Sequence, residues 1–171
     1  MIKDPNLMDK NDGPWYYEMH EVGFNYCITD FQCTLGSSQL KKLDSFVENR
    51  REIAKKYNNL FSNIEFIKTQ KVQNTVEHSY HLYPLQIDFE KFLLTKVDLF
   101  KKMIETGVNL QVHYIPIHLQ PFYRKKYGFQ EGDFPNSESF YKNELSLPIY
   151  PDLSTDDVSS VVNNLLENIS I

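Results

Sequence analysis

The sequence lacks the features that mark several specialised classes of protein. It has no run of about 18 apolar residues, and its first twenty residues lack the continuous apolar stretch of a signal peptide. We therefore expect a cytoplasmic protein without a membrane span. Its two cysteines, Cys27 and Cys33, are too few for a disulfide framework and lack the paired spacing of a zinc site. They predict buried free thiols.

An excess of positive charge is also missing. Eighteen basic residues stand against 23 acidic ones, for a formal net charge of -5, so a nucleic-acid partner is not expected. The 171 residues are 41% hydrophobic and 24% charged, which is a globular composition with enough chain for one ordinary core. No glycine-rich phosphate loop, nucleophile elbow or zinc-protease motif occurs. The residues alone therefore indicate no self-sufficient active site.

The five histidines could suggest a metal site. His78 and His81 are close in sequence, and His113 and His118 lie on either side of Pro116. Residues three apart on a strand face opposite sides of a sheet, so the first pair could not share one ion on a regular strand. We expect structural histidines and no metal ligands.

The apolar pattern begins after a polar segment. Residues 1–22 contain two prolines and no sustained apolar period, which predicts a loop or connector. Thr29 and Gln32 then have the spacing of a capping box, so a helix should begin near Asp30. Apolar residues at three- and four-residue steps predict that this helix is long and amphipathic, with a bend or break near Gly36.

Shorter elements follow, and their order predicts an α+β fold. A small layer of short antiparallel or mixed sheet, flanked by helices and preceded by the long helix, suits this order. We expect strands at 65–68, 75–87 and 108–114. A helix is expected at 91–106, ended by Gly107, and a loop region around Pro116, Pro121 and Gly128. A short helix capped by Ser137 should run through Glu144, and a last helix should begin at Ser154 and end near Ile169.

Two segments are candidates for ligand binding. Residues 109–118 place amide, imidazole and phenol groups at the end of an expected strand, just before Pro116, where they could bind a polar ligand. The alternative is an aromatic edge strand whose polar ends meet water. Asn25 precedes the capped helix, where free backbone N–H groups favour an anion. The alternative there is an Asn-stabilised turn.

A longer motif surrounds Asn25. The sequence GFNYCITDFQ at 23–32, LG at 35–36 and QLKKLD at 39–44 resembles the signature of the DegT/DnrJ/EryC1/StrS aminotransferases. The segments VHYIPIH at 112–118 and ELSLPIYP at 144–151 are similar to their counterparts in that family. These motifs cover the chain from about residue 15 to its end. The family consists of pyridoxal-phosphate (PLP) enzymes that act on nucleotide-linked keto sugars.

The resemblance implies a domain organisation. Family members have the aspartate-aminotransferase fold (fold type I), with a large PLP domain followed by a small C-terminal α+β domain, and they work as homodimers. Residues 1–22 would then be a severed connector and residues 23–171 the C-terminal domain, with the large PLP domain missing. The lysine that forms the Schiff base with PLP would lie upstream of residue 1. No catalytic residue is therefore expected in this chain, and the chain alone should be inactive.

The resemblance also implies binding residues. Asn25 matches the asparagine that reaches across the dimer towards the PLP phosphate. Cys27 stands where the family usually has arginine, which removes a fixed charge from the interface motif. The stretch that contacts the sugar-nucleotide substrate corresponds to Gln111, Val112, His113 and Tyr114.

Two functions follow as hypotheses. The chain could be the C-terminal part of an aminotransferase that moves an amino group from L-glutamate to C4 of a UDP-linked 4-keto-6-deoxy-N-acetyl sugar in pseudaminic acid biosynthesis. Its partners would be the UDP-sugar, L-glutamate and either a second copy in a homodimer or a complementing N-terminal half. Alternatively, it could be a non-catalytic remnant that binds a sugar nucleotide or mediates dimerisation.

Overall fold

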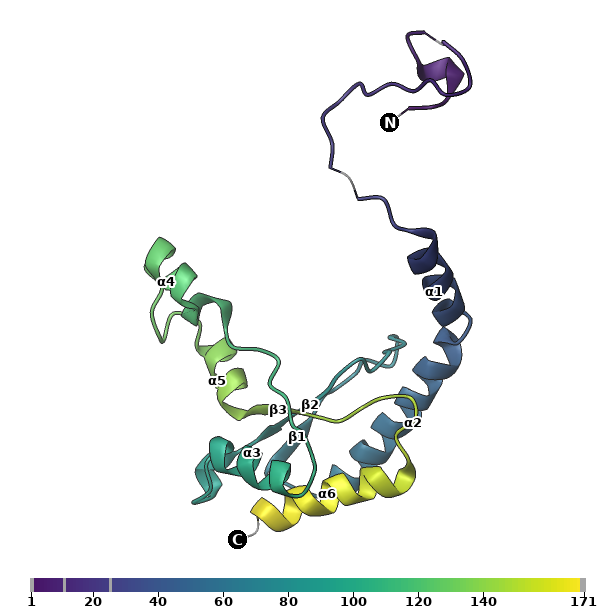
Figure 1. Ribbon diagram of the computed structural model, residues 1–171. Helices are drawn as coiled ribbons and strands as arrows, with labels where there is room; N and C mark the ends of the chain where they lie inside the picture. The colour runs from purple at the N-terminus through teal and green to yellow at the C-terminus, as the bar shows by residue number, and fades with distance from the viewer. Residues whose placement is uncertain (1, 11, 25, 170–171) are drawn as a thin grey trace. The chain divides into compact units, whose positions relative to one another are not determined.

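A computed structural model describes residues 2–10, 12–24 and 26–169. The chain divides into two compact units, one up to Leu40 and one from Lys41 onwards, and each is described by itself (Figure 1). The prediction that a connector ends at residue 22 stays a prediction. Among the helices of the described residues, none is long and apolar enough to cross a membrane.

The first unit contains a short 3-10 turn, Pro5–Leu7, and helix α1, Asp30–Leu40. The predicted capping box is confirmed. Gln32 N donates to Thr29 Oγ1 at 3.3 Å, while Gln32 Oε1 accepts from Thr29 N at 3.0 Å. No residue of α1 is buried, so within this unit the helix is held by its cap and its own backbone hydrogen bonds.

The predicted break in the long helix lies later than expected. Gly36 is an interior residue of α1, where a glycine costs only about 1 kcal/mol relative to alanine. The helix ends at Leu40, and α2, Leu43–Phe61, begins with Phe46 N donating to Lys42 O. The break therefore falls at residues 41–42.

The larger unit contains a three-stranded antiparallel sheet in the order β1-β2-β3. Leu85 at its centre lies opposite Thr69 on one side and Leu145 on the other. Side chains on β2 alternate between buried and half-buried, because successive side chains of a strand point to opposite faces. The strands are β1 Ile67–Thr69, β2 Tyr83–Ile87 and β3 Glu144–Leu147.

Two predicted strands are wrong over most of their length. The strand expected at 75–87 is regular only in β2, because β1 and β3 end opposite its residues and leave the preceding segment without a partner. Tyr80 in that segment has a φ of 46°, which is incompatible with a strand. The strand expected at 108–114 is reduced to one bridge between Gln111 and Ser146. The third strand of the sheet is β3, at residues assigned from sequence to a helix end and a loop.

The helices of this unit differ from expectation mainly at their ends. Thr95 and Asp98 form a capping box, so α3 starts later than the predicted residue 91, and Gly107 follows it with a φ of 82°. Ser137 is inside α5 rather than its cap, and Glu144 belongs to β3. A helix occupies part of the predicted loop, with Pro121 at its first position and Gly128 after its end. The bounds are α3 Lys96–Glu105, α4 Pro121–Tyr127, α5 Pro135–Asn143 and α6 Thr155–Ile169.

The core forms where α6 packs against α2 and α3, while α4 and α5 extend away from these helices (Figure 1). Ser154 caps α6 through reciprocal bonds with Asp157, as the sequence predicts. Tyr57 is fully buried, and its hydroxyl donates to Pro148 O at 3.0 Å, which links α2 to the chain after β3. The three helices bury Ile53, Ala54, Tyr57, Phe61, Leu99, Met103, Val158, Val161, Val162, Leu165 and Ile169.

Truncating this core should destabilise the larger unit in proportion to burial. Leu99 on α3 is fully buried, so Leu99→Ala should lower the free energy of unfolding by about 2 to 5 kcal/mol. Ile104 on the same helix is 58% exposed, and Ile104→Ala should change it by about 0.5 kcal/mol or less. Urea unfolding of the two variants measures both values. Equal effects would show that α3 does not pack as described.

Candidate functional site

The candidate site is built on β3, whose four residues are all buried. Leu145 and Leu147 belong to the hydrophobic core. The alternate positions carry polar side chains: Glu144 has no exposed surface and Ser146 is 3% exposed. A buried carboxylate is costly unless hydrogen bonds or opposite charges compensate it. The surroundings of Glu144 therefore have to supply donors.

The segment after α3 supplies them. Gln111 and Ser146 exchange backbone hydrogen bonds of 3.2 and 2.8 Å. Continuing that register would place His113 opposite Glu144. The backbone N–H of His113 instead donates to the Glu144 side chain, at 3.0 Å from Oε2. This bond ends the strand pairing and holds His113 beside β3.

Hydrogen bonds between side chains complete the cluster. Ser146 Oγ donates to Glu144 Oε1 at 2.8 Å, and Nδ1 of His113 lies 2.8 Å from the same Oγ. Both carboxylate oxygens of Glu144 thus have a donor. We call His113, Ser146 and Glu144 the buried relay.

Lys96 provides an opposite charge near the buried relay. Its Nζ donates to Tyr141 O at 2.7 Å, and its ammonium interacts electrostatically with Glu144. Burial lowers the pKa of Lys96, and the charge of Glu144 opposes that shift. The carboxylate therefore has a nearby cation besides its two hydrogen-bond donors.

The four residues predicted to bind the substrate lie in one segment, but in different settings. Gln111 is exposed, and Val112 and His113 are half-buried. Tyr114 is 71% exposed, and its ring packs edge to face against the His113 ring, with 4.7 Å between the ring centroids. The structure thus brings the rings of His113 and Tyr114 together at the surface. Their contact with a substrate stays a prediction.

Other predicted site features have different outcomes. Asn25 lies outside the described residues. Cys27 and Cys33 are exposed, so the prediction of buried thiols is wrong. Each thiol precedes or lies in α1, which buries no residue within its own unit.

Glu144 and Ser146 are site residues that the sequence pattern did not predict. They were assigned to the end of a helix and to the segment after it. The available signal was the alternation of polar and apolar residues at 144–147, just before Pro148, which is typical of a strand with two covered faces.

A second polar cluster follows the candidate substrate segment. His118 is 7% exposed, and its Nε2 lies 2.7 Å from Glu138 Oε1. Glu138 also accepts from the backbone N–H groups of Gly132 and Phe134. The Gly132 amide and then His118 hold the pKa of the Glu138 carboxyl below its ordinary value. Glu138 therefore ties the loop before α5 to the turn that contains His118.

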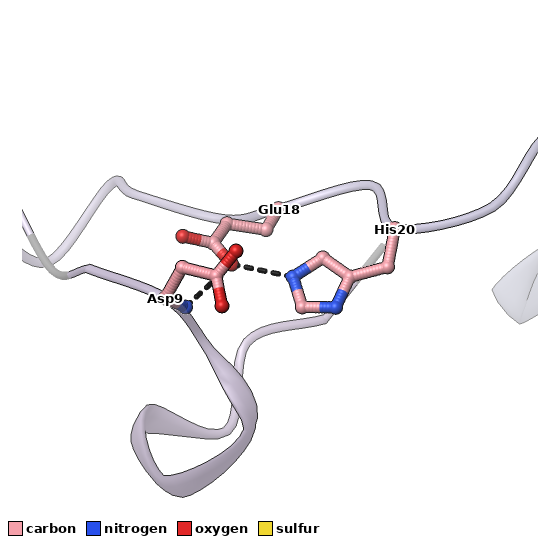
Figure 2. A group of neighbouring side chains, drawn as sticks. All are labelled: Asp9, Glu18 and His20. Atoms are coloured by element: carbon pink, nitrogen blue, oxygen red, sulfur yellow. Dashed lines mark hydrogen bonds and ion pairs between the residues drawn. The ribbon is translucent and has the colours of Figure 1, made fainter.

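A third cluster lies in the first unit (Figure 2). Asp9, Glu18 and His20 each offer a ligand atom within 4.8 Å of the others. Glu18 accepts from His20 Nε2 at 2.6 Å and from the backbone N–H groups of Asp9 and Lys10. The His20 bond and then the Asp9 bond lower the pKa of Glu18 to about 2, and Glu18 raises the pKa of His20. The Glu18 carboxylate is saturated with hydrogen-bond donors, an arrangement that stabilises the loop.

The Glu138 cluster generates a pH prediction. A carboxyl whose pKa is lowered by folding stabilises the folded loop above its unfolded pKa of about 4.3, and that stabilisation is lost as the pH falls through the lowered value. Hydrogen exchange at the Gly132 amide, expressed relative to the intrinsic exchange rate at each pH, should therefore accelerate as the pH falls across this acidic range. Glu138→Gln should accelerate it at neutral pH as well, because the charge-assisted bonds are weakened.

Glu131→Gln is the matched control. Glu131 is exposed and lies beside Gly132 in sequence. Its substitution should leave exchange at Gly132 unchanged. Protection that is equal in wild type and Glu138→Gln would contradict the role assigned to this carboxylate.

Comparison with known proteins gives matches over nearly the whole chain. The DegT/DnrJ/EryC1/StrS aminotransferase family matches residues 5–166. An uncharacterized protein of Methanocaldococcus jannaschii is 42% identical, over 94% of this chain and 42% of its own length. The spore coat polysaccharide biosynthesis protein SpsC of Bacillus subtilis is 40% identical, over 89% and 39%. The UDP-4-amino-4,6-dideoxy-N-acetyl-beta-L-altrosamine transaminase of Campylobacter jejuni is 38% identical, over 88% and 39%.

Solved structures give the same result. Helicobacter pylori PseC, an aminotransferase involved in the biosynthesis of pseudoaminic acid, matches with a TM-score of 0.82 and 25% identity, covering 94% of this chain and 43% of PseC. The sugar aminotransferase Spr1654 of Streptococcus pneumoniae, in its apo-form, matches with a TM-score of 0.82 and 26% identity, covering 94% and 40%. Spr1654 is also known in PLP and PMP forms.

These matches agree in their extent. The chain spans about two fifths of the length of the relatives it matches. Its α+β fold corresponds to part of the sugar aminotransferase structures. The match over residues 5–166 shows that this chain belongs to the DegT/DnrJ/EryC1/StrS aminotransferase family.

Proposed function

We propose that this chain forms the C-terminal domain of a PLP-dependent sugar-nucleotide aminotransferase. The complete enzyme moves an amino group from L-glutamate to C4 of a UDP-linked 4-keto-6-deoxy-N-acetyl sugar in the pseudaminic acid pathway. The observation that carries this proposal is the family match over residues 5–166, which includes the segment from Gln111 to Tyr114. The choice of sugar is supported by the altrosamine transaminase relative. Another relative is a spore coat polysaccharide biosynthesis protein, so the family match alone does not specify the sugar.

The geometry around Gln111 to Tyr114 supports a binding role. Backbone hydrogen bonds hold Gln111 beside Ser146 of β3, and the buried relay holds the His113 ring in place. The Gln111 and Tyr114 side chains remain exposed. Polar groups on a rigid support can bind a polar ligand without first losing much conformational freedom.

The described residues do not by themselves fit PLP, which needs a lysine together with groups that hold its phosphate and ring nitrogen. Lys96 is half-buried, but its Nζ is bonded to Tyr141 O. A groove of about 740 Å³ contains Lys68 and Lys71, yet no carboxylate is among its lining residues. We therefore assign the Schiff-base lysine and the group at the ring nitrogen to the part of the enzyme outside this chain, and only a contact of the PLP phosphate to this chain, through Asn25.

The partners follow from the same proposal. Residues 23–171 contribute the small domain, and a second copy or a complementing N-terminal half contributes the large PLP domain. Asn25 reaches across the homodimer towards the PLP phosphate. Cys27 replaces the usual arginine of that interface with a neutral, exposed thiol. The UDP-sugar and L-glutamate are the substrates.

A chimera tests the activity. The C-terminal region of the Campylobacter jejuni transaminase is replaced by this chain, and transfer from L-glutamate to the UDP-linked 4-keto sugar is followed by chromatography. We expect the chimera to have the PLP absorbance and to form the 4-amino sugar. The chain alone should give no lysine adduct with PLP after borohydride reduction. A dimeric chimera with bound PLP but no transfer would favour the non-catalytic remnant.

Variants of the same chimera test the substrate segment. Gln111→Ala and His113→Ala should each raise the KM for the sugar nucleotide about two- to tenfold, the cost of one neutral hydrogen bond, while the PLP spectrum stays unchanged. Asn109→Ala is the matched control, because Asn109 is exposed two residues before Gln111. Unchanged kinetics in both test variants would show that the segment is only an edge of the domain.

A further inference from the structure

We infer that Glu144 and Ser146 are positioning residues that hold the His113 imidazole as the tautomer protonated at Nδ1, which leaves Nε2 as a hydrogen-bond acceptor. Ser146 Oγ lies 2.8 Å from Glu144 Oε1 on β3 and 2.8 Å from Nδ1 of His113 beside it. The identity of the ligand that meets Nε2 rests on the proposed function. The tautomer itself does not.

The first step is the orientation of the Glu144 carboxylate. Oε2 accepts the backbone N–H of His113 at 3.0 Å, and Oε1 accepts the Ser146 hydroxyl at 2.8 Å. An ionised carboxylate has acceptors only. Since Glu144 has no exposed surface, solvent does not compete for either oxygen.

The second step follows from the single proton of a hydroxyl group. The Ser146 proton is directed to Glu144, so Ser146 Oγ can only accept from its other neighbour. That neighbour is Nδ1 of His113, at 2.8 Å. Nδ1 must therefore carry a hydrogen and donate it. The tautomer of a histidine is set by the bond that one of its nitrogens makes.

The third step concerns the other nitrogen. A neutral imidazole has one N–H, so Nε2 of His113 carries a lone pair. Within residues 2–10, 12–24 and 26–169, Nε2 has no hydrogen-bond partner, and the His113 side chain is half-buried at the surface. The neighbouring Tyr114 ring packs against the imidazole at an interplanar angle of 88°. The lone pair is thus held in a fixed position where a ligand can reach it.

A fixed acceptor selects the chemistry of its ligand. Nε2 in this tautomer accepts from a hydroxyl or an amide N–H of a nucleotide sugar, and it offers no proton to a diphosphate oxygen. A site that hydrogen-bonds a donor group rejects analogues that lack it, because the acceptor is left unpaired. The buried relay therefore acts as a specificity device for the sugar part of the substrate.

The relay also predicts its own reversal. In Glu144→Gln, the backbone N–H of His113 still requires an acceptor and therefore fixes the amide oxygen at the Oε2 position. The amide NH₂ then faces Ser146 and donates to Oγ. The Ser146 proton turns to Nδ1, and the imidazole must carry its hydrogen on Nε2. The nearly isosteric substitution Glu144→Gln thus changes Nε2 of His113 from a hydrogen-bond acceptor into a donor.

Nitrogen NMR of the histidine-labelled full chain measures this directly. At about pH 8, where an ordinary imidazole is neutral, two-bond nitrogen–carbon-proton correlations distinguish the protonated from the unprotonated ring nitrogen. We expect wild-type His113 to be protonated at Nδ1 and Glu144→Gln to be protonated at Nε2. Ser146→Ala, which breaks the relay, should give a mixture of both forms.

Ser62→Ala is the control, since the Ser62 hydroxyl donates only to Asn59 O on α2, and it should leave the His113 signals unchanged. In the chimera, Glu144→Gln should raise the KM for the sugar nucleotide about two- to tenfold with little change in kcat. A wild-type His113 protonated at Nε2, or an unchanged tautomer in both Glu144→Gln and Ser146→Ala, overturns the inference whatever the chimera does. An inactive chimera with the expected tautomers supports the relay and counts only against the proposed function.

Discussion

The packing around β3 in the larger unit depends on how the charge of the buried Glu144 carboxylate is compensated, because solvent does not reach it. Glu144 is placed in the interior by β3, whose neighbouring leucines belong to the core. Leaving that charge unpaired would cost several kcal/mol. The charge is compensated by hydrogen bonds from the His113 backbone N–H and the Ser146 hydroxyl, and by electrostatic interaction with Lys96. The same requirement therefore ends the pairing beside Gln111 and fixes the conformation of the surface segment that follows.

Much of the helical structure could be predicted from the sequence because its signals are local. Thr29 with Gln32, and Ser154 with Asp157, are capping pairs three residues apart, and each starts a helix where expected. Gly107 likewise stops α3 through its own backbone conformation. Strands were harder, since a strand needs a partner. The segment before β2 alternates as a strand should, but it has no neighbouring strand to pair with.

The candidate site was predictable only in part for a related reason. Residues 109–118 were indicated by their amide, imidazole and phenol groups, and the resemblance to a family motif added a predicted substrate role for residues 111–114. The bond from His113 to β3 could not be inferred from spacing because 31 residues separate it from Glu144. Glu144 itself was assigned to a helix, since helix propensity is a local property while burial of a carboxylate is decided by tertiary contacts. Asn25, the predicted cofactor contact, lies outside the described residues.

The distribution of cysteine has a practical consequence for the two compact units. The sequence contains only Cys27 and Cys33, and both lie in the first unit and are exposed there. Maleimide dyes or nitroxide spin labels would therefore attach to that unit alone, without any engineered cysteine elsewhere. Because Cys27 stands where the family usually has arginine, a label there would report on the surroundings of this altered position, while the larger unit, which contains no cysteine, would remain unlabelled.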